Sequence, residues 1–171
     1  MKNTITLLFF VLLTQWVGAQ STNTLDKEEF SIVFPTTYQL DESKSMGTTF
    51  ILYSAADPKK KEDFRENINL IMQEVNPAEM DLQAIIQSTE ASIARLLGNS
   101  KIISSSVKNN QNGEYYELVY SGDMGQLHLQ WLQSLYYKNG TLYILTLTTE
   151  ASSYAEFEKE GKEILNSFRI K

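Results

Sequence analysis

The sequence predicts an α+β fold, in which a largely antiparallel sheet of about six to seven strands is packed by two main helices. Three observations predict it. Several short segments alternate apolar and polar residues with a period of two, as strands do. Two longer segments repeat apolar residues every three or four positions, as amphipathic helices do. The pairs Asn112-Gly113 and Asn139-Gly140 mark tight hairpins, because these residue types tolerate positive φ.

Residues 1–19 are typical of a secretory signal peptide. Lys2 gives a short positive start, Ile5 to Leu13 is almost entirely apolar, and Val17-Gly18-Ala19 supplies small residues before the cleavage point. The apolar run is shorter than the roughly 20 residues that a membrane span needs. We therefore expect cleavage after Ala19, export to the periplasm or the extracellular space, and no transmembrane span in the mature chain.

The composition excludes several classes of function. The formal net charge is −6 and the pI is near 4.9, so nucleic acid and anionic lipid are unfavourable partners. The chain has no cysteine, which excludes disulfides, a thiol nucleophile, an iron–sulfur cluster, a thiolate zinc site and an acylated cysteine anchor. We expect no cofactor.

The rest of the chain reads as one domain. Residues 20–28 are polar and predict a flexible leader, and residues 29–171 contain no repeat and no Pro- or Gly-rich linker. Three strands are predicted first, over 30–34, 48–54 and 66–75, and the segment 57–63 between the last two is predicted to be a loop.

An amphipathic helix follows, with Asp81 as its N-cap and Gly98 as its stop. Its apolar stripe repeats at spacings of three and four: Leu82, Ile85, Ile86, Thr89, Ile93, Leu96 and Leu97. A second helix is predicted from Ser153 to Phe168, where Ser153 and Glu156 have the spacing of a capping box. Gly161 falls on the apolar stripe of this second helix, where a missing side chain lets a helix approach a sheet closely.

Between the helices, four strands are predicted to form an antiparallel meander that begins at Lys101. With Asp123-Met124 as the tip of the middle hairpin, the predicted pairs are Tyr120 with Leu127, Leu118 with Leu129 and Tyr116 with Trp131, all on one face.

With Asn139-Gly140 as the tip of the last hairpin, Tyr136 opposes Tyr143 and Leu132 opposes Leu147 on the other face. Leu135 and Ile144 lie on the first face. Either a bulge near Gln133 switches the sides, or both faces of the sheet are covered. We favour two covered faces.

The order of elements, together with two short segments, is similar to the PsbP-like group, which includes the DcrB-like proteins. The segments are Phe30-Ser31-Ile32-Val33-Phe34-Pro35 and Phe64-Arg65-Glu66-Asn67-Ile68-Asn69-Leu70, and a helix like 81–97 follows the second. The resemblance covers roughly residues 29–170. It implies a non-enzymatic adaptor or assembly fold, and it brings no shared catalytic residues to this chain.

The residues themselves give little sign of catalysis. His128 is the only histidine, no G-x-S-x-G elbow occurs, and His128 is predicted to lie on a polar strand face. The acidic residues Glu156, Glu158, Glu160 and Glu163 spread around the last helix among lysines, and the basic run Lys59–Lys61 is flanked by acids. We interpret both as solvated surfaces and expect neither a metal site nor an enzyme.

The candidate partner surface consists of Tyr115, His128, Gln130, Tyr136 and Tyr143, because tyrosine combines an apolar body with a polar tip. For the tyrosines, packing in the core or beneath a helix is the favoured interpretation. Asn67 and Asn69 project from the same face of one strand, and we interpret this face as exposed to solvent.

Three hypotheses of function follow. The favoured one is an exported, non-catalytic module of the cell envelope that binds another envelope protein. The second is a hydrolase that uses His128, which needs a polar pocket and a carboxylate around that residue. The third is a carrier of a small ligand, which predicts a closed apolar cavity between the sheet and a helix.

Overall fold

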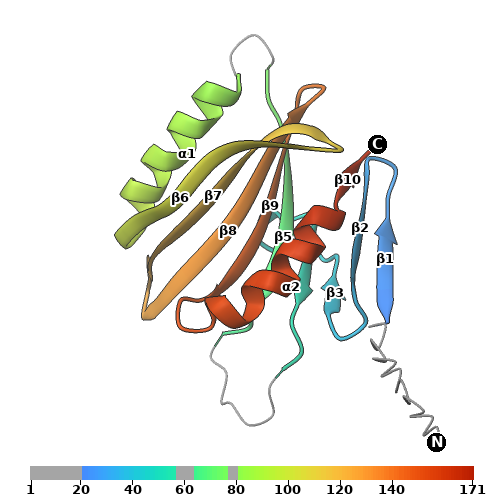
Figure 1. Cartoon of the computed structure of the whole chain (residues 1–171), viewed down its shortest axis with the longest axis horizontal. Coiled ribbons are helices and arrows are strands. Elements are labelled where there is room, and N and C mark those ends of the chain that lie inside the picture. Colours follow the sequence, from blue (N-terminus) through green and yellow to red (C-terminus); the bar gives the residue numbers. More distant parts are fainter. Residues whose placement is uncertain (1–20, 57–63, 77–80) are drawn as a thin grey trace, which may run out of the picture.

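The computed structural model describes residues 21–56, 64–76 and 81–171. The expected signal peptide and the predicted loop 57–63 lie outside the described residues. The described chain forms two antiparallel sheets and two α-helices, as Figure 1 shows. The predicted α+β class is therefore confirmed.

The smaller sheet has the order β1-β2-β10 and brings the two ends of the described chain together. Its strands are β1 (Thr22–Asp26), β2 (Phe30–Pro35) and β10 (Arg169–Ile170). The prediction of a flexible leader over 20–28 is wrong for its central part, because β1 pairs with β2 along its whole length. Leu25 is buried opposite Ile32, and this one apolar side chain fixes an otherwise polar strand to the core.

The larger sheet has seven strands in the order β3-β4-β5-β9-β8-β7-β6. Each strand is antiparallel to its neighbours. The four strands of the predicted meander are the last four in this order, from β9 to β6. A short 3₁₀ turn, Ser45–Gly47, joins the third and fourth strands. The strands are β3 (Gln39–Asp41), β4 (Phe50–Tyr53), β5 (Asn67–Glu74), β6 (Gly98–Asn110), β7 (Gly113–Met124), β8 (Leu127–Lys138) and β9 (Thr141–Glu150).

One of the two predicted hairpin registers is confirmed and the other is wrong. Around Asn139-Gly140, Tyr136 pairs with Tyr143 as predicted. The β7–β8 turn lies at Gly125-Gln126 instead of 123–124, so Tyr120 pairs with Trp131. This register differs from the prediction by four positions. Since side chains alternate with a period of two, an even shift leaves every residue on its predicted face.

Both faces of the larger sheet carry a hydrophobic core, which confirms the favoured alternative. The helix α2 (Tyr154–Ser167) covers one face and lies between the larger sheet and β2. The helix α1 (Leu82–Leu96) lies on the opposite face, beside β6 and β7.

The α2 helix packs very closely on β9. A Cβ atom at Gly161 would lie 2.5 Å from Cδ2 of Leu147, so the missing side chain is what permits this approach. The predicted capping box is wrong, because the side chain of Ser153 makes no cap hydrogen bond. Ser153 has a helical backbone conformation (φ −97°, ψ −9°), whereas side-chain capping requires an extended one.

The first helix begins as predicted. Oδ1 of Asp81 accepts a hydrogen bond from the backbone N–H of Ala84 at 2.8 Å, which confirms the N-cap. The helix ends at Leu96, and the chain enters β6 at Gly98 with no loop between them.

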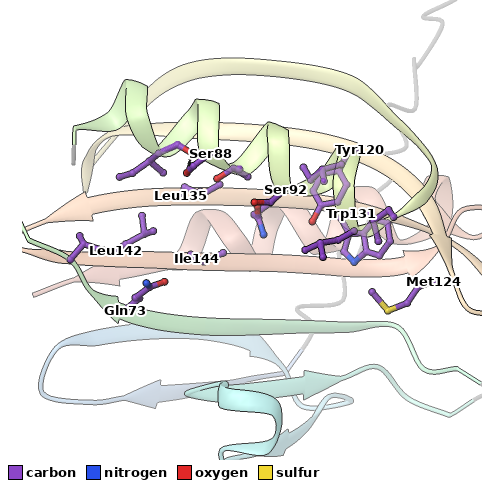
Figure 2. Close-up of a pocket in the computed structure, with 16 residues that line it drawn as sticks. Gln73, Ser88, Ser92, Tyr120, Met124, Trp131, Leu135, Leu142 and Ile144 are labelled. Carbon is purple, nitrogen blue, oxygen red and sulfur yellow. Dashed lines mark hydrogen bonds between the residues drawn. The ribbon is translucent and has the colours of Figure 1, made fainter. Parts of the chain in front are cut away.

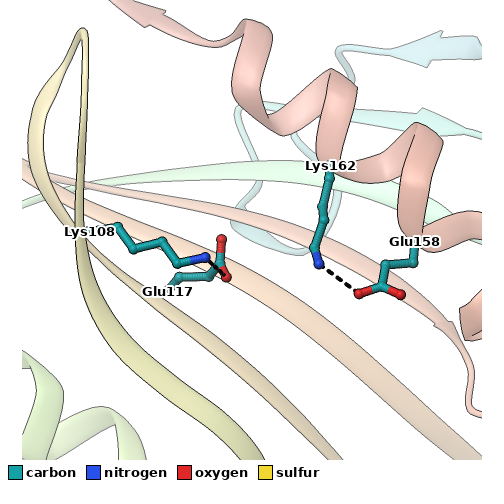
Figure 3. A network of polar contacts seen from close by, with 4 residues as sticks. All are labelled: Lys108, Glu117, Glu158 and Lys162. Carbon is teal, nitrogen blue, oxygen red and sulfur yellow. Dashed lines mark hydrogen bonds and ion pairs between the residues drawn. The ribbon is translucent and has the colours of Figure 1, made fainter.

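The outer surface of the α2 side carries two ion pairs, which Figure 3 shows. Lys108 pairs with Glu117 between β6 and β7 at 2.5 Å, and Lys162 pairs with Glu158 along α2 at 2.6 Å. Partly exposed pairs of this kind contribute little to stability.

Candidate functional site

A groove with a volume of about 500 Å³ lies between α1 and the larger sheet. We call it the α1 groove. Figure 2 shows side chains of the helix above it and of the strands below. Gln73, Ser88, Leu96 and Met124 line it and are exposed, so the groove is open to solvent. The carrier hypothesis required a closed apolar cavity between the sheet and a helix; the groove lies between them, but it is not closed.

The groove exists because the inward side of α1 is not filled. Only Ile85 and Ile93 of its 15 residues are buried. Between them, the positions that face the sheet hold Ser88, Thr89 and Ser92. These side chains are short, so they leave space where leucine would fill it.

The floor of the groove is apolar and comes from two neighbouring strands. Trp131 and Leu135 belong to β8, and Leu142 and Ile144 belong to β9. At the end nearest Met124, the rings of Tyr120 and Trp131 stack with centroids 5.0 Å apart. Burial raises the pKa of Tyr120 to about 12, so this wall stays uncharged at neutral pH.

The polar groups of the groove are neutral. Oγ of Ser88 donates to the carbonyl oxygen of Ile85 at 3.0 Å, and Nε2 of Gln133 donates to Oγ1 of Thr146 at 3.1 Å. Both side chains keep free hydrogen-bonding capacity, since a hydroxyl has two lone pairs and an amide has a second N–H and a carbonyl oxygen. No Asp, Glu, Lys, Arg or His is among the described residues that line the groove.

A hydrogen bond ties α1 to the sheet beside the groove. The hydroxyl of Tyr116 on β7 donates to Oε1 of Glu90 on α1 at 2.5 Å. Burial, followed by this bond to a carboxylate, raises the pKa of Tyr116 to about 12. The bond spans helix and strand, so it fixes the distance between them at this point.

Three residues of the candidate partner surface lie in the core. Tyr115, Tyr136 and Tyr143 are at most 6% exposed, and they pack on the α2 side with Phe168. Tyr115 and Tyr136 stack at 4.8 Å. These tyrosines therefore pack in the core, as the favoured interpretation of the sequence had it, and they form no exposed partner surface.

The other two residues, His128 and Gln130, lie near the surface on β8. Nδ1 of His128 is 2.6 Å from Oδ1 of Asp123, and the histidine side chain is 54% exposed. The hydrogen bond from His128, with a second one from Asn99, lowers the pKa of the Asp123 carboxyl. A carboxylate is thus in reach of His128, but neither residue lines the α1 groove.

Two sets of groove residues escaped the sequence-based prediction. On α1, Ser88 and Ser92 interrupt the apolar stripe at a spacing of four, and this polar gap was a usable signal. On the sheet, Gln73 and Gln133 come from β5 and β8, which the β9 strand separates. Nothing in the sequence places these two glutamines opposite the helix.

The described residues contain no group of three or more Asp, Glu or His side chains arranged to hold a metal ion. No helix among them is long and apolar enough to cross a membrane. Of the four acidic residues on α2, Glu158 is in an ion pair with Lys162.

The sequence profile of the PsbP family matches residues 22–170. The chain belongs to the PsbP family. The resemblance inferred from residues 30–35 and 64–70 is thereby confirmed. No curated protein sequence matches this PsbP-family chain.

Solved structures with the same fold include three from bacteria. CyanoP, the PsbP of Synechocystis sp. PCC 6803, has a TM-score of 0.63 and 16% identity over 92% of this chain and 96% of its own. PA94 of Pseudomonas aeruginosa, of unknown function, has a TM-score of 0.59 and 13% identity, and the match covers 85% of this chain and 94% of PA94. LpqN of Mycobacterium tuberculosis, involved in cell envelope biogenesis, has a TM-score of 0.59 and 12% identity, and the match covers 88% of this chain and 91% of LpqN. These identities establish a shared fold only.

Proposed function

We propose that this PsbP-family protein is an exported, non-catalytic binding protein that carries a small apolar ligand in the α1 groove. The observation that carries the proposal is the groove itself, which is about 500 Å³ in volume and walled by apolar side chains with a few neutral polar groups. Ligand sites of proteins have volumes of about 300–1,000 Å³ and the same mixture of many apolar and few polar groups. The signal peptide expected over residues 1–19 supports export.

The chemistry of the lining favours binding over catalysis. Among the described residues that line the groove, Tyr120 is the one whose side chain can ionise in water, and burial keeps it protonated near neutral pH. General acid–base catalysis needs a group whose pKa lies near the working pH. The groove offers apolar surface and hydrogen bonds to a ligand. None of its described side chains is an acid or base suited to general acid–base catalysis.

Binding can be measured through Trp131. The chain has two tryptophans, Trp16 and Trp131, and cleavage after Ala19 removes the first. In the mature protein, N-phenyl-1-naphthylamine bound in the groove should quench Trp131 by energy transfer and should itself become more fluorescent. We expect saturable binding of one dye molecule per chain.

A matched pair of variants locates the dye. Ser92→Leu places a large side chain in the groove, whereas Ala91→Leu places it at the next position of α1, which is exposed and does not line the groove. Dye binding should be lost in Ser92→Leu and retained in Ala91→Leu. Equal binding by both variants, or no binding by the mature wild-type protein, contradicts the proposal.

A second candidate function is the binding of another envelope protein at β6. This strand ends the larger sheet, and its side chains Ile102, Ile103 and Val107 are 40–48% exposed. Such apolar residues along an unpaired strand edge favour a partner. The test is a crosslinking pull-down of wild type beside Val107→Glu, with Lys159→Glu on the exposed side of α2 as the control. A partner lost only in Val107→Glu supports this candidate, and a partner retained in it, or none captured, rejects it.

A further inference from the structure

The α1 groove is elongated. Its helix wall runs from Ile85 to Leu97, and at 1.5 Å per residue this stretch is about 18 Å long. An extended hydrocarbon chain can lie along a wall of this length.

The groove has a polar part and an apolar part. Ser88 and Ser92 lie on the helix, and Gln73 lies across from them on β5, as Figure 2 shows. The stacked rings of Tyr120 and Trp131 line the other end, which extends to the exposed Met124. A ligand that satisfies both parts is an amphiphile, with its tail on the aromatic rings and its polar group between the helix and β5.

The polar group of this ligand must be uncharged. The described residues that line the groove supply no charge, so a carboxylate or an ammonium ion held at the half-buried Ser92 and Gln133 would lose part of its hydration without gaining an opposite charge. The acidic residue of α1, Glu90, already accepts a hydrogen bond from the hydroxyl of Tyr116. Hydroxyls and an amide instead offer both donors and acceptors, which suits an alcohol, an ester or an amide.

We propose that the α1 groove selects an uncharged amphiphile, such as a long-chain alcohol or a monoacyl ester, over an ionised fatty acid of the same length. The inference rests on the proposed function and adds the class of ligand. Ser92 and Gln133 are the residues that determine the preference for a neutral polar group, because both line the middle of the groove.

The test is displacement of N-phenyl-1-naphthylamine from the mature protein at pH 7.5 by three probes below their critical micelle concentrations. These are 1-dodecanol, monododecanoylglycerol and sodium dodecanoate. We expect the two neutral probes to displace the dye at concentrations at least tenfold lower than dodecanoate. Equal potency, or a preference for dodecanoate, overturns the inference while dye binding still supports the proposed function. Failure of the dye to bind overturns both.

A charge introduced into the groove should reverse the preference. Ser92→Lys puts an ammonium group beside the ligand, and we expect dodecanoate to become the strongest competitor. Ala91→Lys adds the same charge to the exposed side of α1 and should leave the order of the probes unchanged. If both variants keep the wild-type order, the polar group does not lie at Ser92 and the assigned geometry is wrong. If Ser92→Lys does not fold, the probe order of the wild type still decides the selectivity.

Discussion

The two helices lie on opposite faces of one sheet and pack on it in opposite ways. Of the 14 residues of α2, four are buried, and Gly161 lets its backbone approach Leu147 closely. Of the 15 residues of α1, two are buried, and a groove of about 500 Å³ separates part of the helix from the sheet. Small residues occur on the inward side of both helices. What differs is whether their neighbours let the helix move inward.

On the α2 side, the sheet fills the space that Gly161 leaves, because Leu147 projects directly at it. On the α1 side, Ile85 and Ile93 contact the sheet, and the hydroxyl of Tyr116 donates a hydrogen bond to Glu90. The helix rests on these points and cannot move down onto Ser88 and Ser92. A small residue therefore brings a helix closer or leaves a cavity, according to the contacts on either side of it.

The largest expected effect is at the end of α2. Phe168 is fully buried and contacts the rings of Phe30, Tyr136 and Tyr143. Phe168→Ala should lower the free energy of unfolding by about 3–5 kcal/mol, because it leaves a cavity in a close-packed core. Urea denaturation measures this. The corresponding change at the end of α1, Leu96→Ala, should have an effect below about 0.5 kcal/mol, because Leu96 is 72% exposed. Similar losses in the two variants would contradict the comparison.

The same substitution should have opposite effects beneath the two helices. Gly161→Leu forces a side chain against Leu147 and should cost about 1–3 kcal/mol or more. Ser92→Leu enters the groove and should leave the free energy of unfolding unchanged or raise it by up to about 1 kcal/mol. Both values come from denaturation curves at one pH. A clear loss of stability in Ser92→Leu would show that α1 has no space beneath it.

Loss of the N-cap should affect α1 alone. Asp81→Ala removes the bond to the backbone N–H of Ala84 and should cost about 1 kcal/mol. Since α1 has few buried contacts, we expect its amide hydrogens to exchange roughly fivefold faster, with those of α2 unchanged. Ser153→Ala is the matched control, because the Ser153 side chain makes no cap bond. Faster exchange throughout the protein would mean that α1 does not open separately.

The smallest expected effect is at His128, which belongs to neither helix interface. His128→Gln removes the contact with Asp123, and the two side chains are 54% and 35% exposed. Exposed ion pairs contribute little, so the Tm should change by no more than about 2 °C. Dye binding in the α1 groove should also be unchanged. Loss of binding in this variant would place His128 in the ligand site.

Much of the fold follows from the sequence, because it is encoded locally. The periods of 3.6 and 2.0 locate both helices and the long strands, and Asn139-Gly140 fixes its hairpin register. The β7–β8 register could not be fixed in this way, because Ser121 to Gly125 offers several turn positions and an even shift preserves the pattern. The two-residue strand β10 is too short to show any period.

Less of the candidate site could be predicted, because its residues meet only in three dimensions. The polar gap at Ser88 and Ser92 is visible on α1, but the groove also needs β5, β8 and β9 in their order in the sheet. Tyr136 and Tyr143 show the same limit, because the sequence left both a core and a surface position open for them. Tyrosine suits interfaces and cores equally, and only the position of α2 decides between them.

The pairing of β10 with β2 also has a consequence for the order of folding. Ile170 pairs with Phe30, so the last strand of the described chain pairs with its second strand, β2. Contacts between residues so far apart in sequence form slowly and late, because a long loop must be closed before they are gained. Phe30 and Phe168, whose ring centroids lie 5.7 Å apart, thus cannot meet until Phe168 has been synthesised. The α2-side core is therefore one of the last parts of the molecule to be completed.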